Sequence, residues 1–359
     1  MEENEKQSTQ AENNLEPNKE QNVSPVTAAQ EITVSKTNEA AFLIKETTLM
    51  KKVEQLNAEI ATKLIGQSDL VEKMTIALFC NGHALIEGVP GIAKTLAAKL
   101  FTKVLDVGFS RIQFTPDLMP SDIIGTSIYN TKTGEFEFKK GPIFSNIILI
   151  DEVNRAPAKT QSALFEAMEE RQVSVDGTTY KLPDPFMVLA TQNPVEHEGT
   201  YKLPEAQLDR FLFKIDIAYP DLEEEIQILQ AALNPKEFYS LENVKPVLSA
   251  KDIADFKTTI GQIKVEANLL KYIAQITEVT RGSNQLFLGA SPRASIGILM
   301  ASKALAAING RDFVTPEDIK ECLSPILKHR LILTPEKEIE GITIDQIIDE
   351  MVEQVEIPR

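Results

Sequence analysis

The sequence predicts an α/β protein with a parallel sheet flanked by helices, followed by a second, all-helical domain. Three observations support this fold class. Short continuous apolar runs alternate with helical patterns up to about residue 220, which is typical of parallel strands buried on both faces. A glycine-rich loop joins the first of these runs to a helix. Beyond that point the apolar residues follow only a helical spacing.

The chain divides into three parts by composition. Residues 1–40 are acidic and polar with few large apolar side chains, so we expect a disordered tail. Residues 41–219 carry the alternating pattern of an α/β core, and residues 220–359 form the predicted helical domain. The three parts together predict a tail, a core and a helical lid.

The elements follow in order along the chain. A helix is expected near Thr47–Leu64, after which Gly66 breaks it and Ser68 caps the next helix. Five buried strands are expected near His83–Ile86, Phe109–Phe114, Ile147–Ile150, Phe186–Ala190 and Phe211–Ile217. Later helices are expected at Leu222–Ala232, Ala267–Thr280, Ala294–Ala307 and Pro316–Lys328.

Overall composition excludes several classes of protein. The 359 residues are 43% hydrophobic without a run long enough to span a bilayer, so we expect no direct membrane insertion. The net charge of −16 argues against nucleic acid as a general partner, because such binding needs a basic surface. Cys80 and Cys322 have no paired spacing and the N-terminus lacks an apolar signal segment, which together predict a cytoplasmic location.

The segment Gly88-Val89-Pro90-Gly91-Ile92-Ala93-Lys94-Thr95 has the parts of a phosphate-binding loop, and Leu96 continues into the following helix. Its small residues let backbone N–H groups converge on phosphate oxygens. Lys94 is expected to reach the β- and γ-phosphates, and the Thr95 hydroxyl to hold Mg²⁺. The general pattern has glycine where this chain has Ala93. Because alanine disfavours positive φ, we expect an ordinary backbone conformation there.

A second motif ends the strand that begins near Ile147. Asp151 is expected to hold Mg²⁺, and Glu152 to polarise the water that attacks the γ-phosphate. The alternative is a buried strand that meets a solvated acidic turn.

Three further polar residues complete the candidate site. Asn193 follows another apolar strand and could orient the attacking water, although Asn before Pro is also a common turn. Arg210 could reach the γ-phosphate of a neighbouring subunit, or form a salt bridge with Asp209 or Glu205. Arg293 stands at a helix start, where a cation is unfavourable, which indicates a role beyond helix stability.

Together these motifs resemble the AAA+ ATPases, and within them the MoxR family, over roughly residues 45–355. The resemblance is carried by the loop with its Ala93, by the segments 114–122 and 151–157, and by the segment 203–211. It implies ATP and Mg²⁺ as cofactors. The implied roles are Walker A for Lys94 and Thr95, Walker B for Asp151 and Glu152, sensor 1 for Asn193, an arginine finger acting in trans for Arg210, sensor 2 for Arg293, and adenine contact for Ile65 and Gly66.

The resemblance also implies two β-hairpin insertions, within Ile124–Phe144 and Gln172–Leu182, with turns at Asn130–Gly134 and Asp176–Thr179. Glycine in each turn and alternating flanks agree with hairpins, which could contact a substrate or be ordinary surface hairpins.

The function that the resemblance implies is an oligomeric ATPase, most often a hexameric ring, with a chaperone-like role. Its implied partners are proteins with a von Willebrand factor A domain, and the role can include metal insertion or complex maturation. Two alternatives remain at this point: an ATPase acting on nucleic-acid complexes, as a helicase loader or transcription activator, and a nucleotide-gated scaffold with little turnover. The sequence shows no helix-turn-helix or basic stripe, and the intact set of catalytic residues argues against a scaffold.

Overall fold

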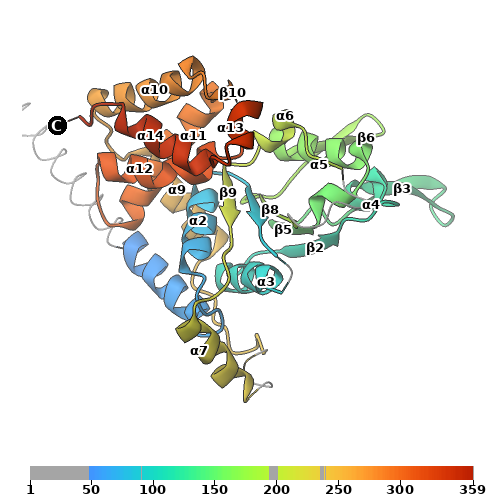
Figure 1. Ribbon diagram of the computed structural model, residues 1–359. Helices are drawn as coiled ribbons and strands as arrows, with labels where there is room; N and C mark the ends of the chain where they lie inside the picture. Colours follow the sequence, from blue (N-terminus) through green and yellow to red (C-terminus); the bar gives the residue numbers. More distant parts are fainter. Residues whose placement is uncertain (1–47, 90, 194–200, 235–237, 239, 359) are drawn as a thin grey trace, which may run out of the picture. The chain divides into compact units, whose positions relative to one another are not determined.

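Five parallel strands form the central sheet, in the order β2-β5-β8-β1-β9 (Figure 1). Their bounds are β1 Ala84–Glu87, β2 Phe109–Gln113, β5 Ile147–Asp151, β8 Met187–Gln192 and β9 Phe213–Asp216. Every residue of β5 is buried, as expected of a strand covered on both faces. The predicted parallel sheet is therefore confirmed, with strand ends within about two residues of the expected ones.

The computed structural model describes residues 48–358 apart from Pro90 and residues 194–200, 235–237 and 239. The predicted tail over residues 1–40 lies outside the described residues. The described part of the chain belongs to one compact unit, so the predicted boundary near residue 220 stays a prediction. None of the helices in this part is long and apolar enough to cross a membrane.

Helices cover both faces of the sheet. Helix α5 (Ala158–Glu170) places Leu164 and Phe165 in one apolar cluster with Ile148 and Ile150 of β5. Helix α3 (Lys94–Leu105) contacts β5 without joining that cluster, so it covers the other face, to which the alternate residues of the strand point. The sheet is thereby the middle layer of an α/β/α arrangement.

Before the sheet, a helix over residues 48–61 is followed by α2 (Ser68–Phe79). The break at Gly66, with φ of +75°, is as predicted. The predicted cap is wrong, because Ser68 is already helical and Gln67 is the capping residue, without a side-chain hydrogen bond.

The C-terminal region is mostly helical. Its main elements are α7 Leu222–Ala232, α9 Ala250–Gly261, α10 Ala267–Gly282, α11 Pro292–Ile308, α12 Pro316–Leu327, α13 Pro335–Ile339 and α14 Ile344–Glu353. It also contains an antiparallel pair, β10 (Leu286–Leu288) and β11 (Ile332–Leu333). The expectation of helices alone is therefore wrong in this detail. Strands of three and two residues are too short for an alternating pattern to identify.

Both expected hairpins are present. The first pairs β3 (Gly125–Asn130) with β4 (Glu135–Lys140), and the second pairs β6 (Gln172–Val175) with β7 (Thr178–Lys181). They contact each other through Phe138 and Tyr180, whose rings stack with centroids 4.5 Å apart. The first hairpin projects away from the sheet (Figure 1) and leaves Phe136 73% exposed.

Candidate functional site

The predicted phosphate-binding and acidic residues gather at one edge of the sheet. Because all five strands are parallel, their carboxyl ends meet there. The glycine-rich loop follows β1, Asp151 ends β5, and Asn193 follows β8. Lys94 connects two of these strand ends, since its Nζ donates to the carbonyl oxygens of Gly88 at 2.5 Å and Gln192 at 3.4 Å. We call this side the carboxyl edge.

The loop adopts a conformation that the sequence did not predict. Ala93 has φ of +61° and ψ of +17°, so the expectation of an ordinary backbone there is wrong. Gly91, two residues earlier, also has a positive φ of +92°. The left-handed conformation costs an alanine roughly 1–2 kcal/mol. Ala93 adopts it directly before Lys94, the first residue of α3.

The other loop residues have these positions. A Cβ added at Gly88 would lie 2.5 Å from Ile92 Cδ1, so the end of the Ile92 side chain would have to move. Val89 and Gly91 flank Pro90, which lies outside the described residues. Thr95 and Leu96 are in the first turn of α3, whose N-terminus is directed toward the loop.

Asp151 is buried at 7% exposure and has two side-chain partners. Its Oδ2 accepts from Arg111 Nε at 2.6 Å, and its Oδ1 accepts from Thr191 Oγ1 at 3.2 Å. Thr191 Oγ1 in turn accepts from the backbone N–H of Glu152 at 3.1 Å. The carboxylate is therefore fixed in direction before any ligand arrives.

Glu152 has a left-handed backbone, with φ of +57°. Its carboxylate accepts from Gln113 Nε2 at 2.8 Å and pairs with Arg155 Nε at 3.1 Å. Gln113 ends β2, so a fourth strand contributes to this edge. Arg111 and Gln113 were not identified as site residues from the sequence. They could have been found only from their spacing, because two polar residues two positions apart in a strand point to the same face.

Asn193 is buried at 7% exposure directly after the carbonyl that accepts from Lys94. Ile65 is half-buried, and Gly66 lies against the first turn of α7, where an added Cβ would come within 2.5 Å of the Glu224 carboxylate. Since α7 follows the end of β9, Ile65 and Gly66 also lie at the carboxyl edge.

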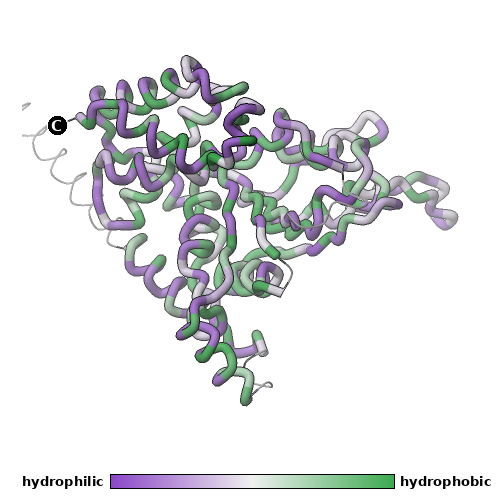
Figure 2. The backbone as a smooth tube through the Cα atoms, in the orientation of Figure 1, coloured by the Kyte–Doolittle hydropathy of each residue, from purple (hydrophilic) through white to green (hydrophobic). Residues whose placement is uncertain are grey.

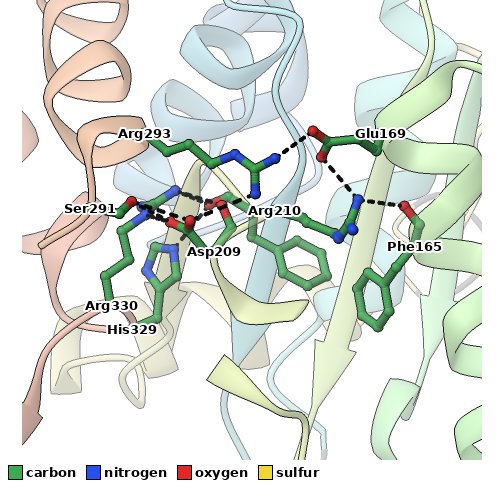
Figure 3. A network of polar contacts seen from close by, with 9 residues as sticks. Phe165, Glu169, Asp209, Arg210, Ser291, Arg293, His329 and Arg330 are labelled. Atoms are coloured by element: carbon green, nitrogen blue, oxygen red, sulfur yellow. Dashed lines mark hydrogen bonds and ion pairs between the residues drawn. The ribbon is translucent and has the colours of Figure 1, made fainter. Parts of the chain in front are cut away.

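Arg210 and Arg293 lie together elsewhere, and both contact the carboxylate of Glu169 (Figure 3). Arg293 Nη1 also pairs with Asp209 Oδ2, at 3.8 Å. Glu169 Oε2 accepts from Arg210 Nη1 at 2.9 Å, and Glu169 Oε1 accepts from Arg293 Nη2 at 2.6 Å. Arg210 Nη1 also donates to the Phe165 carbonyl oxygen at 3.1 Å. The alternative prediction for Arg210, an ion pair with Asp209 or Glu205, is wrong, because the side chain extends toward Glu169 at the end of α5.

The shortest ion pair of Asp209 is with a buried arginine, Arg330. Arg330 Nε donates to Asp209 Oδ1 at 2.6 Å, and its Nη2 donates to the Phe211 carbonyl oxygen at 2.7 Å (Figure 3). Burial lowers the pKa of Arg330, and Asp209 opposes that shift. Ser291 Oγ also donates to Asp209, at 3.2 Å. These contacts join the C-terminal helices to the core. Neither Arg330 nor Glu169 was identified from the sequence as part of the site.

The two groups of residues occupy opposite edges of the sheet. Arg210, Arg293 and Glu169 line a hollow of about 340 Å³ together with His83, which precedes β1. The loop begins at Gly88, after the same strand. A strand rises about 3.3 Å per residue, so the run from His83 to Gly88 separates the edges by roughly 16 Å. We call the arginine side the amino edge.

A buried histidine lies under the amino edge. The backbone N–H of Val188 donates to His83 Nδ1 at 3.0 Å, so the proton is on Nε2, 3.3 Å from the carbonyl oxygen of Met168. Burial and the nearby Arg171 lower the pKa of His83 to about 3. The imidazole is therefore neutral and structural.

Two family models and several known proteins match this chain. The family model described as "ATPase family associated with various cellular activities (AAA)" matches residues 83–213, and the model of the AAA lid domain matches residues 278–351. The chaperone MoxR1 of Mycobacterium tuberculosis is 44% identical over 86% of this chain and 82% of its own length. The protein YeaC of Bacillus subtilis is 45% identical over 86% of this chain and 95% of its own. A crystal structure of a putative ATPase from Cytophaga hutchinsonii has 43% identity and a TM-score of 0.82, covering 91% of this chain and all of that one.

Proposed function

Since the chain belongs to the MoxR family of AAA+ ATPases and is an ATP hydrolase, we propose that it acts as an oligomer whose ATP sites are shared between neighbouring copies. One observation carries this proposal. Arg210 and Arg293 lie at the amino edge, roughly 16 Å of strand away from the loop of their own chain. That span exceeds the reach of an arginine side chain, so these guanidinium groups serve the nucleotide of the next copy.

At the carboxyl edge, the loop amides and Lys94 bind the phosphates, while Ile65 and Gly66 lie beside the adenine. The Thr95 hydroxyl and the Asp151 carboxylate are hard oxygen donors of the kind that suits Mg²⁺. Arg111 and Thr191 already hold Asp151, which supports this fit. When bound, Mg²⁺ would neutralise charge on the phosphates.

For hydrolysis, Glu152 accepts the proton of the attacking water and Asn193 orients that water. Glu152 must first release Gln113 or Arg155, because both occupy its carboxylate. Arg210 and Arg293 of the neighbouring copy then stabilise the charge of the transition state. Turnover consequently depends on assembly.

We propose a hexameric ring that remodels protein partners, with the two hairpins as the contact surface. Phe136 and Tyr129 of the first hairpin are 73% and 53% exposed, and the rings of Phe138 and Tyr180 support the hairpin from behind. The partner class is proteins with a von Willebrand factor A domain, including those that acquire a metal. The chaperone name of the mycobacterial relative supports a protein substrate.

A mixing experiment tests the shared site. Lys94→Ala removes the loop cation but keeps Arg210, whereas Arg210→Ala keeps the loop. Each variant alone should be inactive, and a mixture should regain part of the ATP turnover, measured as phosphate release. A mixture of Lys94→Ala with Glu152→Gln is the matched control and should stay inactive, because both lesions lie at the carboxyl edge. Mixed oligomers without turnover in the first mixture would refute the shared site.

A separate experiment tests the hairpins. Replacement of residues 130–134 by a Gly-Ser linker should preserve folding and basal hydrolysis but abolish the stimulation of turnover by a partner with a von Willebrand factor A domain. Retained stimulation would remove the first hairpin from the contact surface.

A further inference from the structure

Helix α7 carries a stripe of exposed aliphatic side chains. Leu222, Ile226, Leu229 and Leu233 recur at intervals of four and three residues, which places them on one helix face. They are 74%, 39%, 62% and 80% exposed. None of the eleven residues of α7, all of which the structure describes, is buried. Figure 2 shows hydrophobic positions recurring along this projecting helix. We call these four residues the α7 stripe.

A helix of this kind needs a covering surface. Isolated helices shorter than about 12–15 residues are marginal in water, and most helix stability in proteins comes from packing of an apolar face. The capping box of Asp221 and Glu224 satisfies the first turn but buries no apolar area. The sequence of α7 therefore fits a helix that is completed by contact with another surface.

The position of the α7 stripe suggests what that surface is. The Glu224 carboxylate lies against Gly66 at the carboxyl edge. This is the side of the chain that lacks the arginines of the ATP site. In the proposed oligomer, the surface that approaches it is the amino edge of the next copy.

The amino edge carries an apolar patch of its own. Leu288 lines a hollow with Asp209 and Arg330, and Ile296 lines the hollow that holds Arg210 and Arg293. Leu288 and Ile296 are 41% and 62% exposed, and Phe287, which precedes Leu288 in β10, is 77% exposed. We call Phe287, Leu288 and Ile296 the lid patch.

The charges around the two surfaces are opposite. Acidic Glu223 and Glu225 are exposed in the first turn of α7. The lid patch is flanked by Arg293, 51% exposed, and by Arg281, which is exposed and donates to the Ala290 carbonyl oxygen. Such complementarity favours one orientation and opposes pairing of two identical surfaces.

We propose that the α7 stripe of one copy packs on the lid patch of the next, which forms a head-to-tail contact beside each shared ATP site. This inference rests on the proposed function and adds the apolar surfaces that hold the copies together. A head-to-tail contact uses two different surfaces, so it continues from copy to copy until a ring closes.

The test uses two double variants of the full chain, Leu229→Gln/Leu233→Gln and Phe287→Ser/Ile296→Gln. Neither changes the net charge or a residue of the ATP site. Each removes two side chains from the contact, which should weaken association on the order of 100-fold. Assembly is measured by sedimentation with a non-hydrolysable ATP analogue. The control is Leu270→Gln/Ile339→Gln, which alters two exposed apolar residues outside both surfaces and should assemble normally.

A mixture of the two double variants gives the sharpest result. One intact α7 stripe and one intact lid patch remain, so dimers should form and no larger species.

Assembly of either double variant like the wild type, while the wild type hydrolyses ATP, would overturn this inference and leave the proposed function standing. Loss of assembly in the α7 variant but not in the lid-patch variant would indicate that two α7 helices pair with each other. Recovery of assembly when residues 1–47 are deleted from a double variant would indicate that this segment contacts the mutated surface. Either result would overturn the inference. A wild-type chain that hydrolyses ATP as a monomer would refute the shared site as well.

Discussion

The two edges of the central sheet hold different chemistry. The carboxyl edge has a glycine-rich loop, a lysine and two carboxylates, and the lysine and both carboxylates contact residues of neighbouring strands. The amino edge has the guanidinium groups of Arg210 and Arg293 around Glu169. Under the function that we propose, neither edge is a complete ATP-hydrolysing site. One chain then carries two complementary halves, and its activity depends on bringing two copies together.

The largest expected effects come from one substitution at each edge, and they differ in whether ATP hydrolysis or ATP binding is lost. Arg210→Ala should lower kcat by about 10³–10⁵-fold, because an arginine finger stabilises charge only in the transition state. Its affinity for ATP, measured by calorimetric titration, should stay unchanged. Lys94→Ala should instead lose ATP binding. If Arg210→Ala lost ATP affinity and kept kcat, the assignment of the amino edge would be wrong.

Within the carboxyl edge, Glu152→Gln should lower kcat by about 10²–10⁴-fold while ATP still binds, because the amide cannot accept the proton of water. Single-turnover phosphate release measures the effect. Glu170→Gln, which removes an exposed carboxylate near the other edge, is the control and should turn over normally. Wild-type turnover of Glu152→Gln would place the general base elsewhere.

A smaller effect is expected at Glu169, which holds both arginines. Glu169→Gln removes the charge between them, and we expect kcat to fall about tenfold, equivalent to about 1.4 kcal/mol, with KM for ATP unchanged. Thermal stability should change little, because partly exposed ion pairs contribute about 0–1 kcal/mol. Glu169→Asp should recover part of the rate. An effect on stability alone would make Glu169 merely structural.

The last effect concerns the pH dependence of stability and leaves turnover at neutral pH unchanged. His83 has a pKa of about 3 in the folded chain, below the usual 6.5, so folding favours its neutral form. The stabilisation is present above pH 6.5 and is lost as the pH falls toward 3. Between pH 7 and pH 5, the free energy of unfolding should fall by roughly 2 kcal/mol more in the wild type than in His83→Gln. Urea titrations at both pH values measure this, and equal losses would contradict it.

The sequence by itself determined the elements whose signals are local. Continuous apolar runs predicted β1, β5 and β8 because these inner strands are buried on both faces. The outer strands β2 and β9 were also predicted, although each contains polar residues. The loop residues, Asp151 and Asn193 could be located because each follows a strand, and parallel strands end at one edge. The two hairpins were expected from the family resemblance, and the turn residues around Gly134 and Gly177 agreed with that expectation.

Tertiary structure decided what depends on residues far apart in the chain. The left-handed Ala93 was unpredictable from alanine's own preference, because the surrounding loop imposes it. Arg210 and Arg293 share Glu169 as a partner, and Glu169 lies 41 residues from Arg210 and 124 residues from Arg293 in the sequence. Most of all, the separation of both arginines from the loop of their own chain follows from the direction of the strands. Sequence position cannot show this for Arg293, because that residue lies in α11, outside the sheet.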